Sequence, residues 1–271
     1  MDHFRYHSKW HDNRICSSLN FHLISFDDLR LTLNRFWEVE HDTTPKPFSL
    51  EEKAWRVIPV KRNLEGRFIV KLPTRQDKLD ELGESKDIAL KCFKSLEKRL
   101  IAQPRMYDEY KKFMDEYRLL NHMREVTRST MLSQGSPTFY LPHHAVQNET
   151  SSTIKLRVVF DGSYKITIWL SLNDTLGVGP TLQEDLFSIL ARFRTFKIAL
   201  TSDIAKMYRQ VLVDSTQTPL QRIFWRESPD EPIKTFELLT VTYGTSSASF
   251  LAIRALRKLA EDNADCYPRA S

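Results

Sequence analysis

A single aspartate in the second half of the chain follows a pattern that is typical of a metal-binding carboxylate. The apolar run Phe196–Leu200 predicts a buried strand, and Asp203 comes just after it. Because a carboxylate at the end of a core strand is costly to bury alone, a bound divalent cation is one interpretation. The carbonyl of Ile204 would offer another oxygen, and Tyr208 an adjacent aromatic ring. The alternative is that Asp203 caps the following turn.

A short basic segment precedes this aspartate by about forty residues. In a strand alternate residues share a face, so Lys155, Arg157 and Asp161 are expected to point to one side. The two cations would suit a triphosphate, and Asp161 could hold Arg157 through a forked hydrogen-bonded pair. An ordinary exposed strand face with mixed charges is the alternative.

A third segment, Tyr243–Phe250, is a turn of small residues that leads into a helix. Gly244 permits close approach of the backbone, and amides at the helix start could meet a base or a phosphate. A tightly packed helix N-terminus is the alternative interpretation.

Taken together and in order, these segments and four others resemble the reverse transcriptase of BEL/Pao-type long-terminal-repeat retrotransposons. The matching segments are Leu141–Val146, Lys155–Ser163, Leu170–Asp174, Val178–Leu186, Asp203–Val211, Gln221–Arg226 and Val241–Thr245. Upstream, Arg35–Glu40 and Gly66–Pro73 resemble the part of the same polyprotein between its protease and its polymerase. The resemblance covers about residues 21 to 264.

The resemblance implies an RNA-directed DNA polymerase that uses Mg²⁺, an RNA template, an RNA–DNA duplex and a deoxynucleoside triphosphate. Asp203 would be the catalytic carboxylate and would bind the metal with Ile204, while Tyr208 would disfavour a ribose 2′-hydroxyl. The nucleotide-binding set that it implies is Lys155, Arg157, Ile204, Ala205, Tyr208, Tyr243 and Gly244.

The chain also departs from the family pattern. The aromatic-x-Asp-Asp motif, which carries the other metal ligands, is not found after Asp203, and we interpret Asp27 and Asp28 as helix-capping residues. Ser249 stands where the family has Pro, and Ile166–Trp169 contains no Gly. We therefore expect a truncated polymerase region that is inactive alone. The rival hypotheses are a non-catalytic nucleic-acid-binding remnant and a functionless fragment.

The elements that would position these residues are short strands and amphipathic helices. Alternation and turn residues predict strands at Arg67–Pro73, Phe139–Val146, Ile154–Phe160, Gln221–Arg226 and Thr235–Thr242, the last four forming two hairpins. Helical periodicity predicts helices near 26–38, 87–100, 106–122 and 247–262. A further helix would be capped by Thr181 with Glu184, and its buried stripe would be Leu186, Ile189, Leu190 and Phe193.

This order of elements predicts an α+β fold with helices on one face of an antiparallel sheet. The resemblance implies a helical linker region followed by the incomplete fingers and palm of a right-hand polymerase. We divide the chain into a polar tail (1–20), a linker region (21–85) and fingers with partial palm (86–271).

Composition limits the function classes further. The 271 residues are 41% hydrophobic and 28% charged, with a net charge of +5, which suits a globular protein with a phosphate-bearing partner or a solvated basic surface. Cys16, Cys92 and Cys266 show no metal-ligand spacing, which favours a reducing compartment. No apolar run approaches a membrane span, so we expect a cytoplasmic protein with no membrane partner.

Overall fold

The computed structural model describes residues 49, 53, 55, 58–127, 137–147, 156–166, 169–195, 197–198 and 200–267. These residues belong to one compact unit, Phe48–Ser271. The expected helix at 26–38, the polar tail, the Asp27–Asp28 pair and Lys155 lie outside the described residues.

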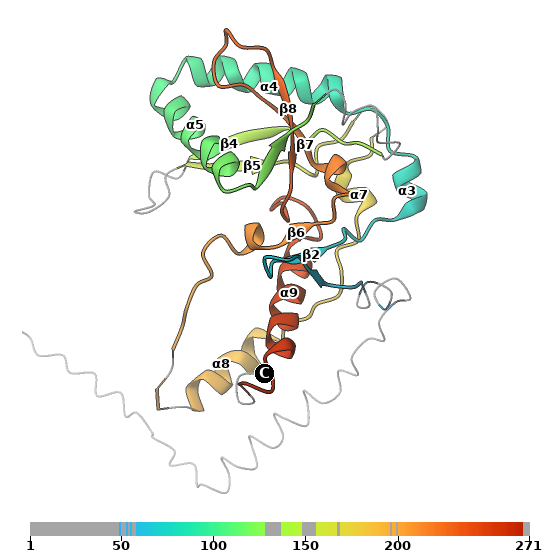
Figure 1. Cartoon of the computed structure of the whole chain (residues 1–271), viewed down its shortest axis with the longest axis vertical. Helices are drawn as coiled ribbons and strands as arrows, with labels where there is room; N and C mark the ends of the chain where they lie inside the picture. Colours follow the sequence, from blue (N-terminus) through green and yellow to red (C-terminus); the bar gives the residue numbers. More distant parts are fainter. Residues whose placement is uncertain are drawn as a thin grey trace, which may run out of the picture. The chain divides into compact units, whose positions relative to one another are not determined.

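Short strands alternate with helices along the chain, as Figure 1 shows. The strands are β1 (Lys61–Arg62), β2 (Phe68–Val70), β3 (Met123–Glu125), β4 (His143–Gln147), β5 (Leu156–Phe160), β6 (Leu212–Val213), β7 (Arg222–Trp225) and β8 (Lys234–Leu238). The helices are α3 (Gln76–Asp80), α4 (Lys86–Ile101), α5 (Pro104–Leu119), α7 (Leu172–Thr175), α8 (Leu186–Thr195) and α9 (Ala248–Asp262), with 3₁₀ helices η1 (Met207–Gln210) and η2 (Thr218–Gln221). None of the described helices is long and apolar enough to cross a membrane.

The described strands form three small sheets, of order β1-β2-β6, β3-β8-β7 and β4-β5. All pairs are antiparallel except β2 with β6. The pairing of β4 with β5 and of β7 with β8 confirms both predicted hairpins, and the mixture of elements confirms the α+β class. Since β2 pairs with β6, the segment that we assigned to a linker region contributes a strand to the same compact unit as the later residues.

Backbone hydrogen bonds join these sheets to one another. The chain that leads into β4 runs parallel to β7, because Leu141 N–H donates to the Arg222 carbonyl (2.7 Å) and Arg222 N–H to the Phe139 carbonyl (2.9 Å). Likewise, Val213 N–H donates to the Leu239 carbonyl (2.9 Å), just beyond the end of β8. The short strands are thereby held in one connected framework.

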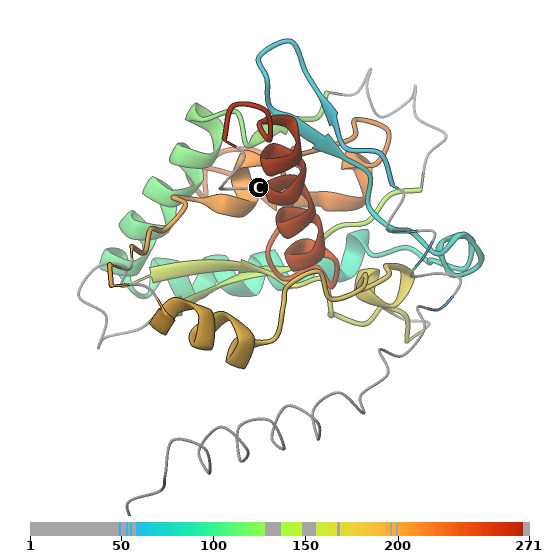
Figure 2. The ribbon, with the colours of Figure 1, turned by 90° about the horizontal axis from the view of Figure 1, so that it is seen from below.

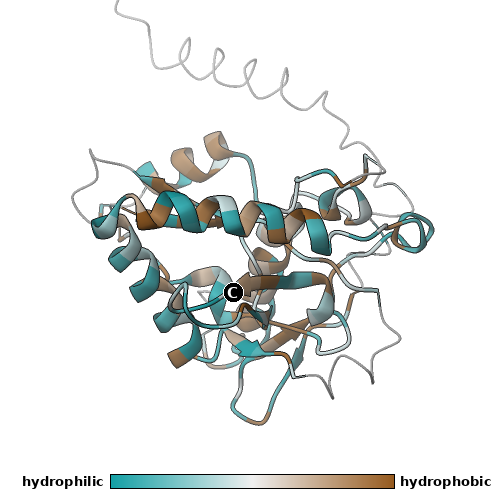
Figure 3. Ribbon diagram, turned by 90° about the horizontal axis from the view of Figure 1, so that it is seen from above, coloured by the Kyte–Doolittle hydropathy of each residue, from teal (hydrophilic) through white to brown (hydrophobic). Residues whose placement is uncertain are grey.

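Helices α4 and α5 pack against the sheets that contain β7, β3, β4 and β5 (Figure 1). Each helix buries one apolar face, as helical periodicity predicts: Ala89, Phe93, Leu96 and Leu100 on α4, and Met106, Tyr110, Met114 and Tyr117 on α5. Leu120, just after α5, is 41% exposed. Figure 3 shows hydrophobic and hydrophilic residues along the same helix α4, as expected for an element half in contact with a core.

Helix α8 differs from its prediction in two ways. Its start is capped by Asp185, which accepts hydrogen bonds from the Ser188 amide (2.8 Å) and hydroxyl (2.5 Å), and not by Thr181 with Glu184. None of its residues is buried, and Leu186 is 70% exposed, so the predicted inner stripe is wrong. The cap was mispredicted because Asp caps a helix at least as well as Thr does. The stripe was mispredicted because helical periodicity does not show whether another element covers the helix.

The predicted strand at 196–200 is also wrong. Ile198 is 76% and Leu200 is 90% exposed, and the described residues of this run form no strand. Apolar composition alone does not supply a neighbouring strand to pair with. Asp203 therefore does not stand at the end of a buried strand.

A buried carboxylate links the strands of the β3-β8-β7 sheet. Glu237 on β8 is 1% exposed and accepts two hydrogen bonds from Arg222 on β7 (3.1 and 3.0 Å). Its other oxygen accepts from Arg124 on β3 (2.8 Å) and from the Thr218 hydroxyl (3.0 Å). Two guanidinium groups and a hydroxyl thus offset the cost of burying this charge.

A buried histidine joins β4 to helix α5 and to β7. His143 Nε2 lies 2.8 Å from the Phe224 carbonyl, which can only accept, so Nε2 carries the proton and Nδ1 accepts from the Tyr110 hydroxyl. Burial lowers the pKa of His143 to about 4. His144 is exposed, so the two adjacent histidines face opposite sides of the strand.

This histidine predicts a loss of stability in acid. Below pH 6.5 this histidine is protonated in the unfolded chain, whereas in the folded chain it stays neutral down to about pH 4. The free energy of unfolding therefore decreases as the pH is lowered from 6.5 to 4. The loss from this group is expected to reach about 3 kcal/mol at pH 4. Urea unfolding of His143→Gln at several pH values should give a shallower pH dependence than the wild type. His144→Gln is the control, and parallel curves for wild type and His143→Gln would contradict the assignment.

Candidate functional site

One asparagine connects three segments that the sequence analysis singled out separately. Asn173 Nδ2 donates to the Ser163 hydroxyl (2.8 Å) and to the Gly244 carbonyl (3.0 Å), and its Oδ1 accepts from the Ser246 amide (2.8 Å). Its own amide donates to the Gly162 carbonyl (2.9 Å). We call these four bonds the Asn173 clamp; they join the end of β5, helix α7 and the turn before α9.

The local sequence around Asn173 explains its position. Ser171 caps α7 by accepting from the Asp174 amide (3.3 Å), and Asp174 returns a bond by accepting from the Ser171 amide (2.9 Å). This capping box starts the helix at Leu172 and places Asn173 in its first turn. Because the clamp uses the Ser246 amide, that amide is not available to a phosphate.

Two glycines make the close approach at the clamp possible. Gly244 has φ +101°, and a Cβ there would lie 2.1 Å from the Phe160 carbonyl oxygen. At Gly162 a Cβ would lie 2.8 Å from Asn173 Oδ1. The predicted close approach at Gly244 is therefore confirmed, and the partner is the backbone of β5.

Tyr243 is fixed against the same strand. Its hydroxyl donates to the Val158 carbonyl, and its ring centroid lies 5.9 Å from that of Phe160. Burial raises the pKa of Tyr243, while the positive charges of Arg209 and Arg157 oppose that rise. Arg157 and Tyr243, predicted to share a site, therefore lie within electrostatic range of each other.

Arg157 is an exposed residue of β5. The expected forked pair with Asp161 does not form among the described residues. Asp161 instead accepts a hydrogen bond from the Ser163 amide (2.9 Å) in a tight turn after β5. The guanidinium is left at the surface, where a polyanion can reach it.

The segment Asp203–Tyr208 is anchored to helix α5 by Glu116. This carboxylate contacts Lys206 Nζ and Arg209 Nη1, each at 2.7 Å. Burial raises the pKa of Glu116, but the two cations outweigh this effect and lower it overall. The Arg209 guanidinium also lies 4.4 Å from the centre of the Tyr117 ring, which fixes η1 on α5.

Tyr208 and Ala205 have identified partners. The Tyr208 hydroxyl lies 3.3 Å from the Ser249 hydroxyl at the start of α9, and the Ala205 carbonyl accepts from Gln210 Nε2 (3.1 Å). A Pro at position 249 has no hydroxyl and could not make this contact. Tyr208 therefore reaches the start of the helix that follows the Gly244 turn.

Asp203 and Ile204 lie in exposed chain before η1. No group of three or more His, Cys, Asp or Glu side chains in the described part of the chain could hold a metal ion. Asp203 with the Ile204 carbonyl is a donor pair of the oxygen type that Mg²⁺ prefers, but two donors do not fill its octahedral coordination. The described residues thus do not form a complete metal centre.

The predicted site residues fall into two groups. Arg157, Tyr243 and Gly244 come together at β5, and Tyr208 approaches the start of α9, while Lys155 lies outside the described residues. Sequence reasoning missed Asn173, although it quoted the segment that contains it. The Ser-x-x-Asp capping signal predicts that this residue lies on a helix. Only the fold brings its side chain to its three hydrogen-bond partners, Ser163, Gly244 and Ser246.

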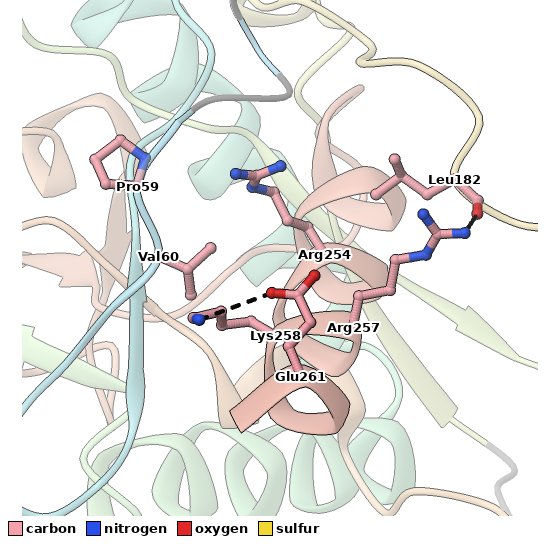
Figure 4. Close-up of a pocket in the computed structure, with 7 residues that line it drawn as sticks. All are labelled: Pro59, Val60, Leu182, Arg254, Arg257, Lys258 and Glu261. Carbon is pink, nitrogen blue, oxygen red and sulfur yellow. Dashed lines mark hydrogen bonds and ion pairs between the residues drawn. The ribbon is translucent and has the colours of Figure 1, made fainter. Parts of the chain in front are cut away.

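A separate cavity of about 470 Å³ lies between helix α9, the chain at Pro59–Val60, and Leu182 (Figure 4). Arg254 donates to the Ile58 carbonyl (2.7 Å) and Arg257 to the Leu182 carbonyl, while Lys258 pairs with Asp262 (2.9 Å). Their spacing along the helix forms a basic stripe that the sequence analysis did not use. Because these cations hold the chain itself together, we interpret the cavity as a structural junction.

No protein-family model and no curated protein matches this chain.

The geometry at Gly244 gives a direct stability test. In Gly244→Ala the new Cβ collides with the Phe160 carbonyl, and we expect the free energy of unfolding to fall by more than about 3 kcal/mol. Gly66 is a matched control, because its φ is +82° and nothing lies within 4 Å of the place that a Cβ would take; Gly66→Ala should cost about 1 kcal/mol. Urea unfolding measures both, and equal losses would contradict the close approach at β5.

Proposed function

We propose that this chain is the fingers and part of the palm of a reverse-transcriptase-type polymerase, and that it binds an RNA–DNA duplex and a deoxynucleoside triphosphate. The observation that supports this most is the convergence at the Asn173 clamp. Segments Lys155–Ser163, Leu170–Asp174 and Val241–Thr245 belong to the set that together resembles a polymerase in sequence, and bonds of the clamp join all three.

The charges near the clamp are consistent with a phosphate-bearing ligand. Arg157 is exposed on β5, and its charge acts on the Tyr243 hydroxyl. The charge of Arg209, which Glu116 fixes, acts on the same hydroxyl. A triphosphate or a backbone phosphate beside Tyr243 would therefore meet the exposed guanidinium of Arg157, whereas Arg209 is largely buried and paired with Glu116.

Within the proposed function, Asp203 and the Ile204 carbonyl are the proposed ligands of Mg²⁺. Phosphoryl transfer by two metal ions needs at least two carboxylates to hold them, and the described residues form no group of three or more His, Cys, Asp or Glu side chains that could hold a metal ion. We therefore propose binding of duplex and nucleotide as the activity of this chain, and derive no catalytic step through the metal.

Arg157 is the residue whose removal tests this proposal. Arg157→Ala should weaken binding of a labelled RNA–DNA duplex about fivefold or more at low salt, and should lower the slope of log K against log salt by about 1. Arg105→Ala is the control, because the Arg105 side chain is 84% exposed on α5 and is not part of the site. Fluorescence anisotropy across a salt series measures both variants.

Three results would contradict the proposal. The first is a wild-type chain that does not bind the duplex even at low salt. The second is an equal effect of Arg157→Ala and Arg105→Ala. The third is primer extension by the wild-type chain that Asp203→Ala abolishes. This result would contradict the part of the proposal that limits the chain to binding.

A further inference from the structure

A second candidate binding surface lies beside the Asn173 clamp and involves none of the residues that the sequence analysis assigned to a site. A cavity of about 390 Å³ lies between helix α4 and the loop that follows β5. Its lining residues are Ile88, Lys91, Cys92, Tyr164, Lys165, Ile166 and Trp169. The lining thus contains two aromatic rings and two lysines, and none of its residues is acidic.

Both rings are available at the surface. Trp169 is 78% exposed and Tyr164 is 39% exposed, whereas Ile166 between them is buried. An indole left in water loses the large gain that burial of an aromatic side chain gives. Exposure of two such rings beside one cavity is therefore a feature that a flat, stacking ligand would explain.

The backbone holds Trp169 in an uncommon conformation. Its φ is +61°, in the left-handed region, which costs a residue with a Cβ about 1 kcal/mol or more. Two hydrogen bonds fix it there, from the Trp169 amide to the Ile166 carbonyl (2.8 Å) and from the Ile166 amide to the Leu170 carbonyl (2.9 Å). The indole is thus presented at the surface by the fold at a cost in local strain.

The two lysines supply the charge that such a ligand would need. Lys91 and Lys165 are exposed, and neither forms an ion pair with a carboxylate in the described part of the chain. The Ser163–Asn173 bond closes the loop that carries Tyr164, which directly follows a residue of the clamp in the chain. Rings that stack on bases, next to cations that meet phosphates, are the two components of single-strand binding.

We infer that Tyr164, Trp169, Lys91 and Lys165 form a stacking platform for single-stranded nucleic acid. The inference extends the proposed function, because it identifies where an unpaired strand would lie next to the duplex and nucleotide site. It does not depend on Arg157 or Asp203, so either proposal can fail without the other.

The test uses the full chain and a 12-nucleotide single-stranded DNA or RNA. Loss of one stacked base is worth about 1–3 kcal/mol, so Trp169→Ala should weaken binding by about 5- to 150-fold, whereas Trp169→Phe keeps a ring and should lose much less. Tyr267→Ala is the control, because Tyr267 is 65% exposed and does not line the cavity. Fluorescence anisotropy gives the affinities, and urea unfolding checks that each variant is folded.

Two further readouts separate stacking from general charge attraction. The strand should quench tryptophan emission in the wild type, and this quenching should be much smaller in Trp169→Phe. Lys91→Gln with Lys165→Gln should lower the salt slope by about 0.7 for each lysine.

The platform would be overturned if Trp169→Ala changed the affinity for the strand by less than twofold and the strand quenched tryptophan emission equally in the wild type and in Trp169→Phe. If the same preparation still binds the duplex through Arg157, the proposed function stands without it. No binding of any single strand at low salt would overturn it as well.

Discussion

The fold depends on a buried carboxylate, that of Glu237, which needs positively charged partners. Glu237 is almost inaccessible to solvent, and its carboxylate is shared by Arg222 and Arg124. Removing one guanidinium would leave one carboxylate oxygen without its cation, and removing both would leave an unpaired charge in the core, so β3, β8 and β7 are constrained to one arrangement. Since the backbone of Arg222 also pairs with the chain that enters β4, this constraint extends to the β4-β5 hairpin and to everything that β5 carries. Figure 2 shows the two strands of this hairpin, drawn in yellow-green, side by side.

The candidate site follows from that framework. Once β5 is in position, its end at Gly162 meets Asn173, and the Asn173 clamp brings in the turn before α9. The same turn places Tyr243 on β5, and Glu116 on α5 holds the segment of Tyr208. Apart from the bond between Gly162 and Asn173, these contacts join segments that are far apart in the sequence, so the site forms only when the framework around it has folded.

The sequence predicted the elements whose signals are local. Both hairpins, helices α4 and α5 and the last helix α9 agree with the predictions because alternation, periodicity and turn residues report on neighbours in the chain. The failures concern contacts between distant segments. The run at 196–200 has strand composition but no pairing partner, and the stripe of α8 has helical spacing but no covering element. Nothing local in Asn173 or Glu237 predicts their partners, which lie up to 113 residues away.

The most direct test of the account is where a nucleotide contacts the chain. A deoxynucleoside triphosphate with a photoreactive base can be crosslinked to the full chain, and the modified peptides mapped by mass spectrometry. The account predicts adducts in the peptides that contain Arg157–Ser163 and Tyr243–Ser246, both suppressed by excess unlabelled nucleotide. Adducts scattered over other surfaces, or adducts at these peptides that unlabelled nucleotide does not suppress, would contradict it.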